Sequence, residues 1–191
     1  PIRREPFPVW PRITEEMKKS LIHTFEEEEW GVGSKTITLF NEQFATMQDA
    51  KYCLSIHSGT SAIWICLKAA GIEAGDEVIL PSYTFIATAT AVVLANAVPV
   101  FADINKKTAN LDPTSVEKLI TKKTKAIIPV HTAGAPADMK AFLDISKKYN
   151  IPIIEDAAQG HGSTIDNKKV GAIGLGGIFS FQTSKNMSSG E

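Results

Sequence analysis

One lysine near the end of the sequence, Lys185, stands where an amine could do chemistry. It follows an apolar run at residues 176–181 that predicts a β-strand, and it lies in a loop rich in serine and glycine. A lysine held in a closed site loses hydration, so the pKa of its amine falls and it can act as a nucleophile and as a base. The alternative is an ordinary lysine on a surface loop.

Asp156 places a carboxylate at the end of another predicted strand. It follows the aliphatic run at residues 151–154 and one glutamate. Because an unpaired buried charge is costly, this carboxylate needs a partner. A salt bridge within the sheet would supply one, and a cationic ligand such as a protonated pyridine ring would supply another. Phe85 offers a flat face for such a ring, or else it is a plain core aromatic.

The turn at residues 58–61 combines small residues with the start of a predicted helix. Backbone N–H groups at a helix N-terminus attract anions, Gly59 lets the backbone approach closely, and the hydroxyl of Thr60 adds a donor. The turn therefore predicts either a phosphate site or an ordinary helix N-cap. A Rossmann dinucleotide site is not expected, because Gly174, Gly176 and Gly177 lack the required spacing.

These residues follow strands of one predicted sheet. Several predicted strands are continuous apolar runs, which is typical of strands covered by helices on both faces. Their alternation with helices predicts an α/β fold, a three-layer α/β/α arrangement around a mostly parallel sheet, in which ligands bind beyond the carboxyl ends of the strands. The predicted strands are 52–56, 77–81, 98–104, 125–131, 151–157 and 176–181, and the predicted helices are 17–30, 36–50, 60–71, 87–97, one from Asp112-Pro113, and 137–150.

The composition favours a folded domain that handles a small molecule. Apolar residues make up 43% of the 191 residues, charged residues make up 21%, and the net charge of −1 gives no basic surface for a nucleic acid. The longest apolar run is interrupted and short for a membrane span, and the charged, proline-rich start is unlike a signal peptide. Cys53 and Cys66 are too few for a disulfide framework and have no metal-ligand spacing, so we expect no metal and a reduced, cytoplasmic protein.

One ligand would satisfy all the candidate residues at once. Its phosphate would bind the Gly59-Thr60 turn and Ser180, and its ring would stack on Phe85. Its ring nitrogen would need Asp156, and its aldehyde would need Lys185. That ligand is pyridoxal 5′-phosphate, which enzymes hold through a lysine Schiff base and an acidic partner of the ring nitrogen.

The sequence also resembles a known family almost from end to end. The matching segments are EWGVGSKTITLFNEQFA, SGTSAIWICLKAAGIEAGDEVILPSYTFIATATAV, VPVFADI, the run from LDP to TKAIIPVH, IPIIEDAAQGHGS and FSFQTSKNMSSGE. They are similar to the sugar aminotransferases of the DegT/DnrJ/EryC1/StrS type, a branch of the fold-type I, aspartate-aminotransferase-like enzymes. The resemblance implies roles for seven residues: Lys185 binds the cofactor, Asp156 faces its ring nitrogen, Gln159 lies beside its ring hydroxyl, Ser180, Gly59 and Thr60 bind its phosphate, and Phe85 stacks on its ring.

The resemblance further implies amino transfer from glutamate or glutamine to a keto sugar, a sugar nucleotide or a cyclitol ketone. A regulatory protein that binds the same cofactor is one alternative. A sugar dehydratase is another, although the family's dehydratases carry histidine at the position of Lys185. Many members have His-Pro where this chain has Gln182-Thr183, and the VWP and HTAG elements look more like the cyclitol and 3-amino-5-hydroxybenzoate synthase members.

The resemblance also predicts how the chain is organised. We expect an N-terminal arm and helix over residues 1–30 and a large cofactor-binding domain over residues 31–191. Family members are much longer, so this domain is expected to be incomplete, with a small C-terminal domain outside the sequence. Members of this fold are homodimers with the active site at the interface, and we expect the same here.

Overall fold

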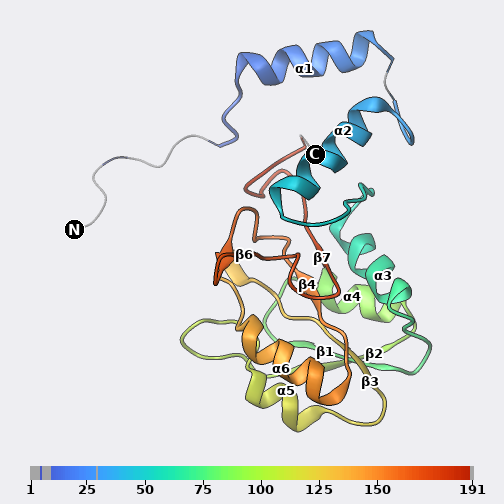
Figure 1. Ribbon diagram of the computed structural model, residues 1–191, viewed down its shortest axis with the longest axis vertical. Helices are drawn as coiled ribbons and strands as arrows, with labels where there is room; N and C mark the ends of the chain where they lie inside the picture. Colours follow the sequence, from blue (N-terminus) through green and yellow to red (C-terminus); the bar gives the residue numbers. More distant parts are fainter. Residues whose placement is uncertain (1–4, 6–9, 29, 190–191) are drawn as a thin grey trace.

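The computed structural model describes residues 5, 10–28 and 30–189. Its centre is a set of parallel strands in the order β2 (Val98–Ala102), β1 (Glu77–Pro81) and β3 (Thr124–Ile127). A second parallel pair joins β4 (Ile154–Asp156) to β7 (Gly176–Ile178). Parallel bridges connect the segment of β3 to that of β4, so the two ladders continue one another (Figure 1). The prediction of a mostly parallel sheet is confirmed.

Helices cover both faces of this sheet. Alternate residues of a strand face opposite sides, so Val78 and Leu80 join the apolar cluster under α3 (Gly59–Ala69) and α4 (Ala87–Leu94). Ile79, between them, joins the cluster under the other two helices. These are α5 (Pro113–Leu119) and α6 (Met139–Tyr149), which lie together on the opposite side of the strands in Figure 1. The three-layer α/β/α prediction is confirmed.

Side-chain caps fix where these helices begin. Ser58 accepts a hydrogen bond from the amide of Ser61 at the start of α3. Asp112 accepts one from the amide of Thr114 at the start of α5, with Pro113 at the first helical position as the sequence predicts. The cap at Ser58 matters for function because it sets the direction of the N-terminal amides of α3.

Two further helices precede the sheet. The segment predicted as helix 17–30 forms α1 (Glu15–Glu26), capped by Thr14, and no residue of it is buried. It stands apart from the layers in Figure 1, while α2 (Lys35–Met47) lies closer and buries Phe44 and Ala45. Most of the irregular arm predicted for residues 1–15 lies outside the described residues, and the division at residue 30 stays a prediction.

Residues 52–56 depart from the prediction of a strand. This segment belongs to no strand, and its backbone forms no ladder with any strand among the described residues. The strand prediction for this segment is wrong because a strand needs a hydrogen-bonded neighbour, which the pattern of apolar residues does not supply. The predicted strand at 125–131 also ends early, at Ile127, two residues before Pro129, which has no N–H to donate.

A short hairpin between β4 and β7 is absent from the sequence-based prediction. Strands β5 (Thr164–Ile165) and β6 (Lys168–Lys169) pair in antiparallel fashion. Asp166 and Asn167 between them have φ angles of 49° and 60°, as a tight two-residue hairpin turn requires. The Asp-Asn pair is the sequence feature that could have revealed this turn. The prediction missed it because the flanking strands are only two residues long.

Close packing of glycines holds β7 against the loop that precedes it. A Cβ added to Gly177 would come within 2.3 Å of the carbonyl oxygen of Gly171, whereas one added to Gly176 meets nothing nearer than the sulfur of Cys66 at 3.9 Å. We therefore expect Gly177→Ala to lower the free energy of unfolding by about 1–3 kcal/mol through overpacking. Urea unfolding would measure this, with Gly176→Ala as the matched control. Equal effects of the two variants would contradict the packing argument.

Candidate active site

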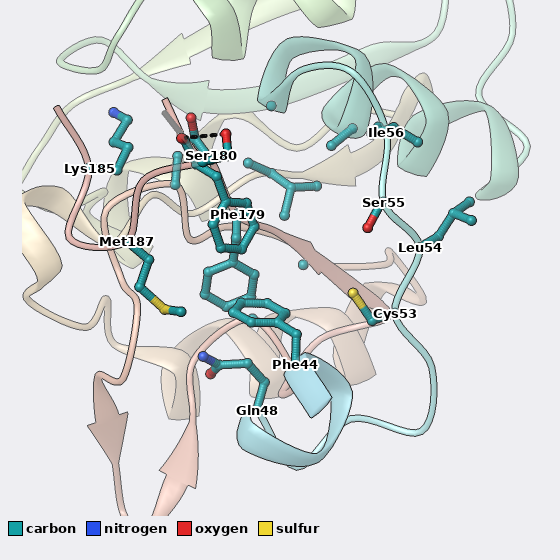
Figure 2. Close-up of a pocket in the computed structure, with 18 of the residues that line it drawn as sticks. Phe44, Gln48, Cys53, Leu54, Ser55, Ile56, Phe179, Ser180, Lys185 and Met187 are labelled. Atoms are coloured by element: carbon teal, nitrogen blue, oxygen red, sulfur yellow. Dashed lines mark hydrogen bonds between the residues drawn. The ribbon is translucent and has the colours of Figure 1, made fainter. Parts of the chain in front are cut away.

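The structure brings all seven residues singled out from the sequence to one cleft. The cleft lies at the carboxyl ends of β4 and β7, beside the N-terminus of α3 and the turn before α4. In the close-up, residues 53–56 line one side of it and Lys185 lies on the other, with Phe179 between them (Figure 2). The seven residues that line it are Gly59, Thr60, Phe85, Asp156, Gln159, Ser180 and Lys185.

Asp156 is a buried carboxylate held by two donors. Its side chain accepts hydrogen bonds from the hydroxyl of Thr88 at 2.8 Å and from the amide of Ala158 at 3.1 Å. Only 5% of the residue is exposed, and this burial raises the pKa of the carboxyl group, although the two hydrogen bonds oppose the shift. Asp156 forms no ion pair with any described residue, so a salt bridge within the sheet is wrong as an explanation for it.

The N-terminus of α3 and Ser180 form a cradle suited to an anion. The first amides of a helix have no partner within the helix, and here they belong to Gly59 and Thr60. A Cβ placed on Gly59 would lie 3.4 Å from the Cβ of Ser180 and 3.8 Å from its hydroxyl oxygen. Glycine therefore leaves room between the helix end and this hydroxyl, as an anion at the helix N-terminus requires.

An aromatic cluster anchors the strand end that carries Ser180. The rings of Phe179 and Phe181 each contact Phe44 of α2 edge-on, with ring centroids 5.0 and 5.1 Å apart. His161 packs against the same rings, and burial lowers the pKa of its imidazole. Figure 2 shows Phe44 and Phe179 packed below Ser180. Ser180 thus projects from a rigid base.

Lys185 sits in a loop shaped by Gln182. The amide of Lys185 donates to the carbonyl of Gln182, and the side-chain oxygen of Gln182 accepts from both the amide and the hydroxyl of Ser184. The amine of Lys185 forms no hydrogen bond or ion pair with any described residue, yet its charge acts on Asp156. An amine with no protein partner near a buried carboxylate is available to a ligand.

Gln159 and Phe85 complete the wall of the cleft. The side-chain oxygen of Gln159 accepts a hydrogen bond of 2.9 Å from the amide of Ala133. Phe85 lies in the turn before α4 and is 68% exposed, so its interpretation as a core aromatic is wrong. Both residues line the cleft.

Thr88 and Glu155 escaped the sequence-based prediction, which noted His131 only as a residue at a strand end. Thr88 holds the carboxylate of Asp156, and Glu155 and His131 form a fully buried pair beside it. Thr88 lies in a predicted helix that faces the sheet, so its hydroxyl had no visible partner. A glutamate within an apolar run, as at position 155, is the one pattern that could have flagged this pair.

None of the helices that the structure describes is long and apolar enough to span a membrane. The described residues also contain no cluster of three or more histidine, cysteine or acidic side chains that would suit a metal ion. The cleft brings together an anion cradle, a buried carboxylate and a lysine amine.

These features describe an α/β protein whose cleft contains an anion cradle, a buried carboxylate, an exposed aromatic ring and a lysine amine. Comparison with known families is more specific. The model of the DegT/DnrJ/EryC1/StrS aminotransferase family matches residues 11–191, so this chain belongs to that family. The resemblance drawn from the sequence motifs is confirmed.

Individual relatives agree with this assignment. The chain is 41% identical to an L-glutamine:2-deoxy-scyllo-inosose aminotransferase of Streptomyces kanamyceticus, over 100% of this chain and 46% of the relative. It is 37% identical to the 3-amino-5-hydroxybenzoate synthase of Amycolatopsis mediterranei, over 97% of this chain and 48% of the relative. An X-ray structure of an aminotransferase from Psychrobacter cryohalolentis matches with a TM-score of 0.93 and 38% identity, covering 97% of this chain and 47% of that one. The chain spans about half the length of these relatives.

Proposed function

We propose that the full-length protein binds pyridoxal 5′-phosphate in this cleft and transfers an amino group from an amino acid to a ketone. The observation that carries the proposal is the convergence of the buried carboxylate of Asp156, the unpartnered amine of Lys185 and the anion cradle of Gly59 and Ser180 on one cleft. Membership of an aminotransferase family supports the same reaction class.

The residues present fit the cofactor. The amides of Gly59 and Thr60, the dipole of α3 and the hydroxyl of Ser180 would hold its phosphate. The exposed ring of Phe85 would lie against one face of its pyridine ring, and the side chain of Gln159 would approach the ring hydroxyl. These contacts would fix the position and the plane of the ring.

Asp156 would hold a proton on the pyridine nitrogen. Burial raises the pKa of its carboxyl group because it destabilises the ionised form. A cation beside the carboxylate would stabilise that ionised form. When bound, the cofactor supplies a cationic ring that accepts the electron pair left on the donor's α-carbon. By keeping that ring protonated, Asp156 would strengthen its electron demand at the reacting carbon.

Lys185 would hold the cofactor through its amine and then act as a proton carrier. Once a donor amino acid had taken its place, the free amine of Lys185 would be positioned to accept the proton of the donor's α-carbon and to release it again, as a general base and acid. Lysine at this position supports amino transfer rather than dehydration.

For the substrates, we propose L-glutamine or L-glutamate as the donor and a keto sugar or a cyclitol ketone as the acceptor. Several relatives are L-glutamine:2-deoxy-scyllo-inosose aminotransferases, and another is a 3-amino-5-hydroxybenzoate synthase. The HTAG element at residues 131–134 and the VWP element at residues 9–11 resemble this group. We therefore favour a cyclitol ketone over a nucleotide sugar.

We further propose that the protein is a cytoplasmic homodimer whose active site lies at the subunit interface. One support is α1, whose apolar side chains Met17, Leu21 and Phe25 are exposed although they share helical spacing. The proposed cytoplasmic location has a different support: Cys53 and Cys66 are free thiols, as is common in a reducing compartment.

The function is tested with the full-length protein loaded with pyridoxal 5′-phosphate. Adding L-glutamine is expected to convert the cofactor to pyridoxamine phosphate, seen as loss of visible absorbance. A panel of keto cyclitols and keto sugars should then restore that absorbance, and the product should carry an amine in mass spectrometry. Loss of water without gain of nitrogen would indicate a dehydratase, and no response to any amino donor would indicate a regulatory protein.

A further inference from the structure

Glu155, next to Asp156, is a buried carboxylate that the proposed reaction does not use. Its side chain is fully buried and accepts four hydrogen bonds. Burial alone would raise the pKa of this carboxyl group, but the donors outweigh it and the pKa lies below its usual value. The donors are the Nε2 of His131 at 3.0 Å and the amides of Gly171 at 2.8 Å, Ile173 at 2.7 Å and Gly174 at 2.7 Å.

The hydrogen bonds of His131 fix its imidazole ring in one tautomer. Its Nδ1 accepts a hydrogen bond of 3.1 Å from the amide of Ala137, so this nitrogen carries no proton. The proton therefore lies on Nε2, which donates it to Glu155. His131 is thus a neutral ring held from both sides, with no part of it exposed.

His131 in turn is connected to two residues of the candidate site, Asp156 and Gln159. Its amide donates to the carbonyl of Asp156, and the amide of Asp156 donates to the carbonyl of Pro129. Two residues after His131, the amide of Ala133 holds the side chain of Gln159. Ala133 has a φ angle of 52°, a conformation that a non-glycine residue keeps only when its surroundings impose it.

We propose that Glu155 and His131 form a positioning pair that holds Asp156 and Gln159 in register with the bound cofactor. Glu155 also accepts hydrogen bonds from three amides of the glycine-rich loop at residues 171–174 and so holds this loop against the same edge of the sheet. Neither residue of the pair touches the cofactor in this scheme. The inference rests on the proposed function, because it concerns the geometry of Asp156 and Gln159, the two polar side chains proposed to face the ring nitrogen and the ring hydroxyl of the cofactor.

A glutamine cannot replace this glutamate, although it has the same shape. All four groups that meet Glu155 are donors, and a carboxylate has acceptor sites for all of them. An amide keeps one oxygen and turns its NH₂ toward two of the donors. His131 cannot adapt by moving its proton to Nδ1, because the amide of Ala137 donates there.

The test compares Glu155→Gln with the wild type in the full-length protein loaded with pyridoxal 5′-phosphate. The readout is the pH midpoint at which the visible absorbance of the bound cofactor changes. An anion held near the cofactor favours its protonated form. Loosening Asp156 is therefore expected to lower the midpoint by about one pH unit and to weaken cofactor binding by about tenfold.

A second variant separates position from charge. His131→Asn keeps an oxygen for the amide of Ala137 but loses the donor to Glu155, and it changes no charge because His131 is neutral. The positioning pair predicts a lower midpoint in this variant as well. The His131→Asn variant also allows the proposal to be tested if Glu155→Gln does not accumulate as folded protein. Glu117→Gln is the matched control, since Glu117 is a surface residue paired with Lys148.

The outcomes are distinct. Lower midpoints in Glu155→Gln and His131→Asn, with Glu117→Gln unchanged, support the positioning pair. A shift in Glu155→Gln alone would overturn it in favour of a direct effect of the charge of Glu155. Unchanged midpoints in folded variants would also overturn it while leaving the proposed function intact. If the wild type binds no cofactor, the proposed function fails first and this inference fails with it.

Discussion

Replacing Lys185 by alanine in the full-length protein is expected to abolish covalent attachment of pyridoxal 5′-phosphate and to lower turnover by about 10²–10⁴-fold. The reason is that one amine has two tasks: it bonds the cofactor, and it moves the proton between the donor's α-carbon and the cofactor. Reduction with borohydride followed by peptide mass spectrometry would measure the first task, with the label on the peptide that contains Lys185. Turnover with L-glutamine would measure the second.

Lys168→Ala provides the control for this variant. Lys168 lies on β6, is exposed and does not line the cleft. Its removal should leave both the borohydride label and turnover unchanged. The assignment of Lys185 is wrong if the label appears on another lysine, or if Lys185→Ala transfers amino groups at the wild-type rate. Because the cradle of Gly59 and Ser180 is intact in Lys185→Ala, that variant should still bind the cofactor without a covalent bond.

The architecture was predictable because burial on both faces leaves a strong mark on sequence. Continuous apolar runs such as residues 78–80 within β1 and residues 151–154, which lead into β4, are not typical of amphipathic strands or surface helices, so they predict a sheet covered by helices. The cap at Asp112-Pro113 likewise follows from local chemistry. In both cases, the information lies within a few consecutive residues.

Features that depend on partners distant in sequence were not predictable in this way. Residues 52–56 have the composition of a strand, but whether they form one depends on a hydrogen-bonded neighbour. The pairing of Thr88 with Asp156 joins residues that are 68 positions apart. Sequence pattern identifies Asp156 as needing a partner, and only the fold shows which hydroxyl supplies it.

The site was predicted as a set of residues, and the structure adds how that set is held. Asp156, Gln159 and Lys185 all follow apolar strands, so a rule about strand ends was enough to collect them. The same rule says nothing about Glu155, which faces away from the cleft opening and binds the loop at residues 171–174. Glu155 escapes the strand-end rule because its partners, three backbone amides and the ring of His131, come together only in the fold.

Asp156→Asn is expected to lower turnover by about 10²–10³-fold while leaving the fold and the bond to Lys185 intact. Asparagine can still accept from the amide of Ala158 and can donate to the hydroxyl of Thr88, which can in turn donate to the hydroxyl of Thr84. The variant therefore removes the charge without removing the hydrogen-bonded frame. A neutral amide no longer stabilises a protonated pyridine ring, so the ring accepts electrons less well. Stopped-flow measurement of the reaction with L-glutamine would show the loss.

The stability of the cofactor-free protein provides an independent check on the same substitution. The pKa of Asp156 is raised in the folded state, so its contribution to stability is fully present below its ordinary pKa and is lost as pH rises through the folded value. Asparagine has no such dependence. The free energy of unfolding of Asp156→Asn, relative to that of the wild type, should therefore increase as pH rises from the ordinary pKa of an aspartate to the raised pKa of the folded state. A difference that stays constant with pH would mean that burial does not destabilise the ionised form of Asp156. The proposal that a cationic ring stabilises this carboxylate would then lose its physical basis.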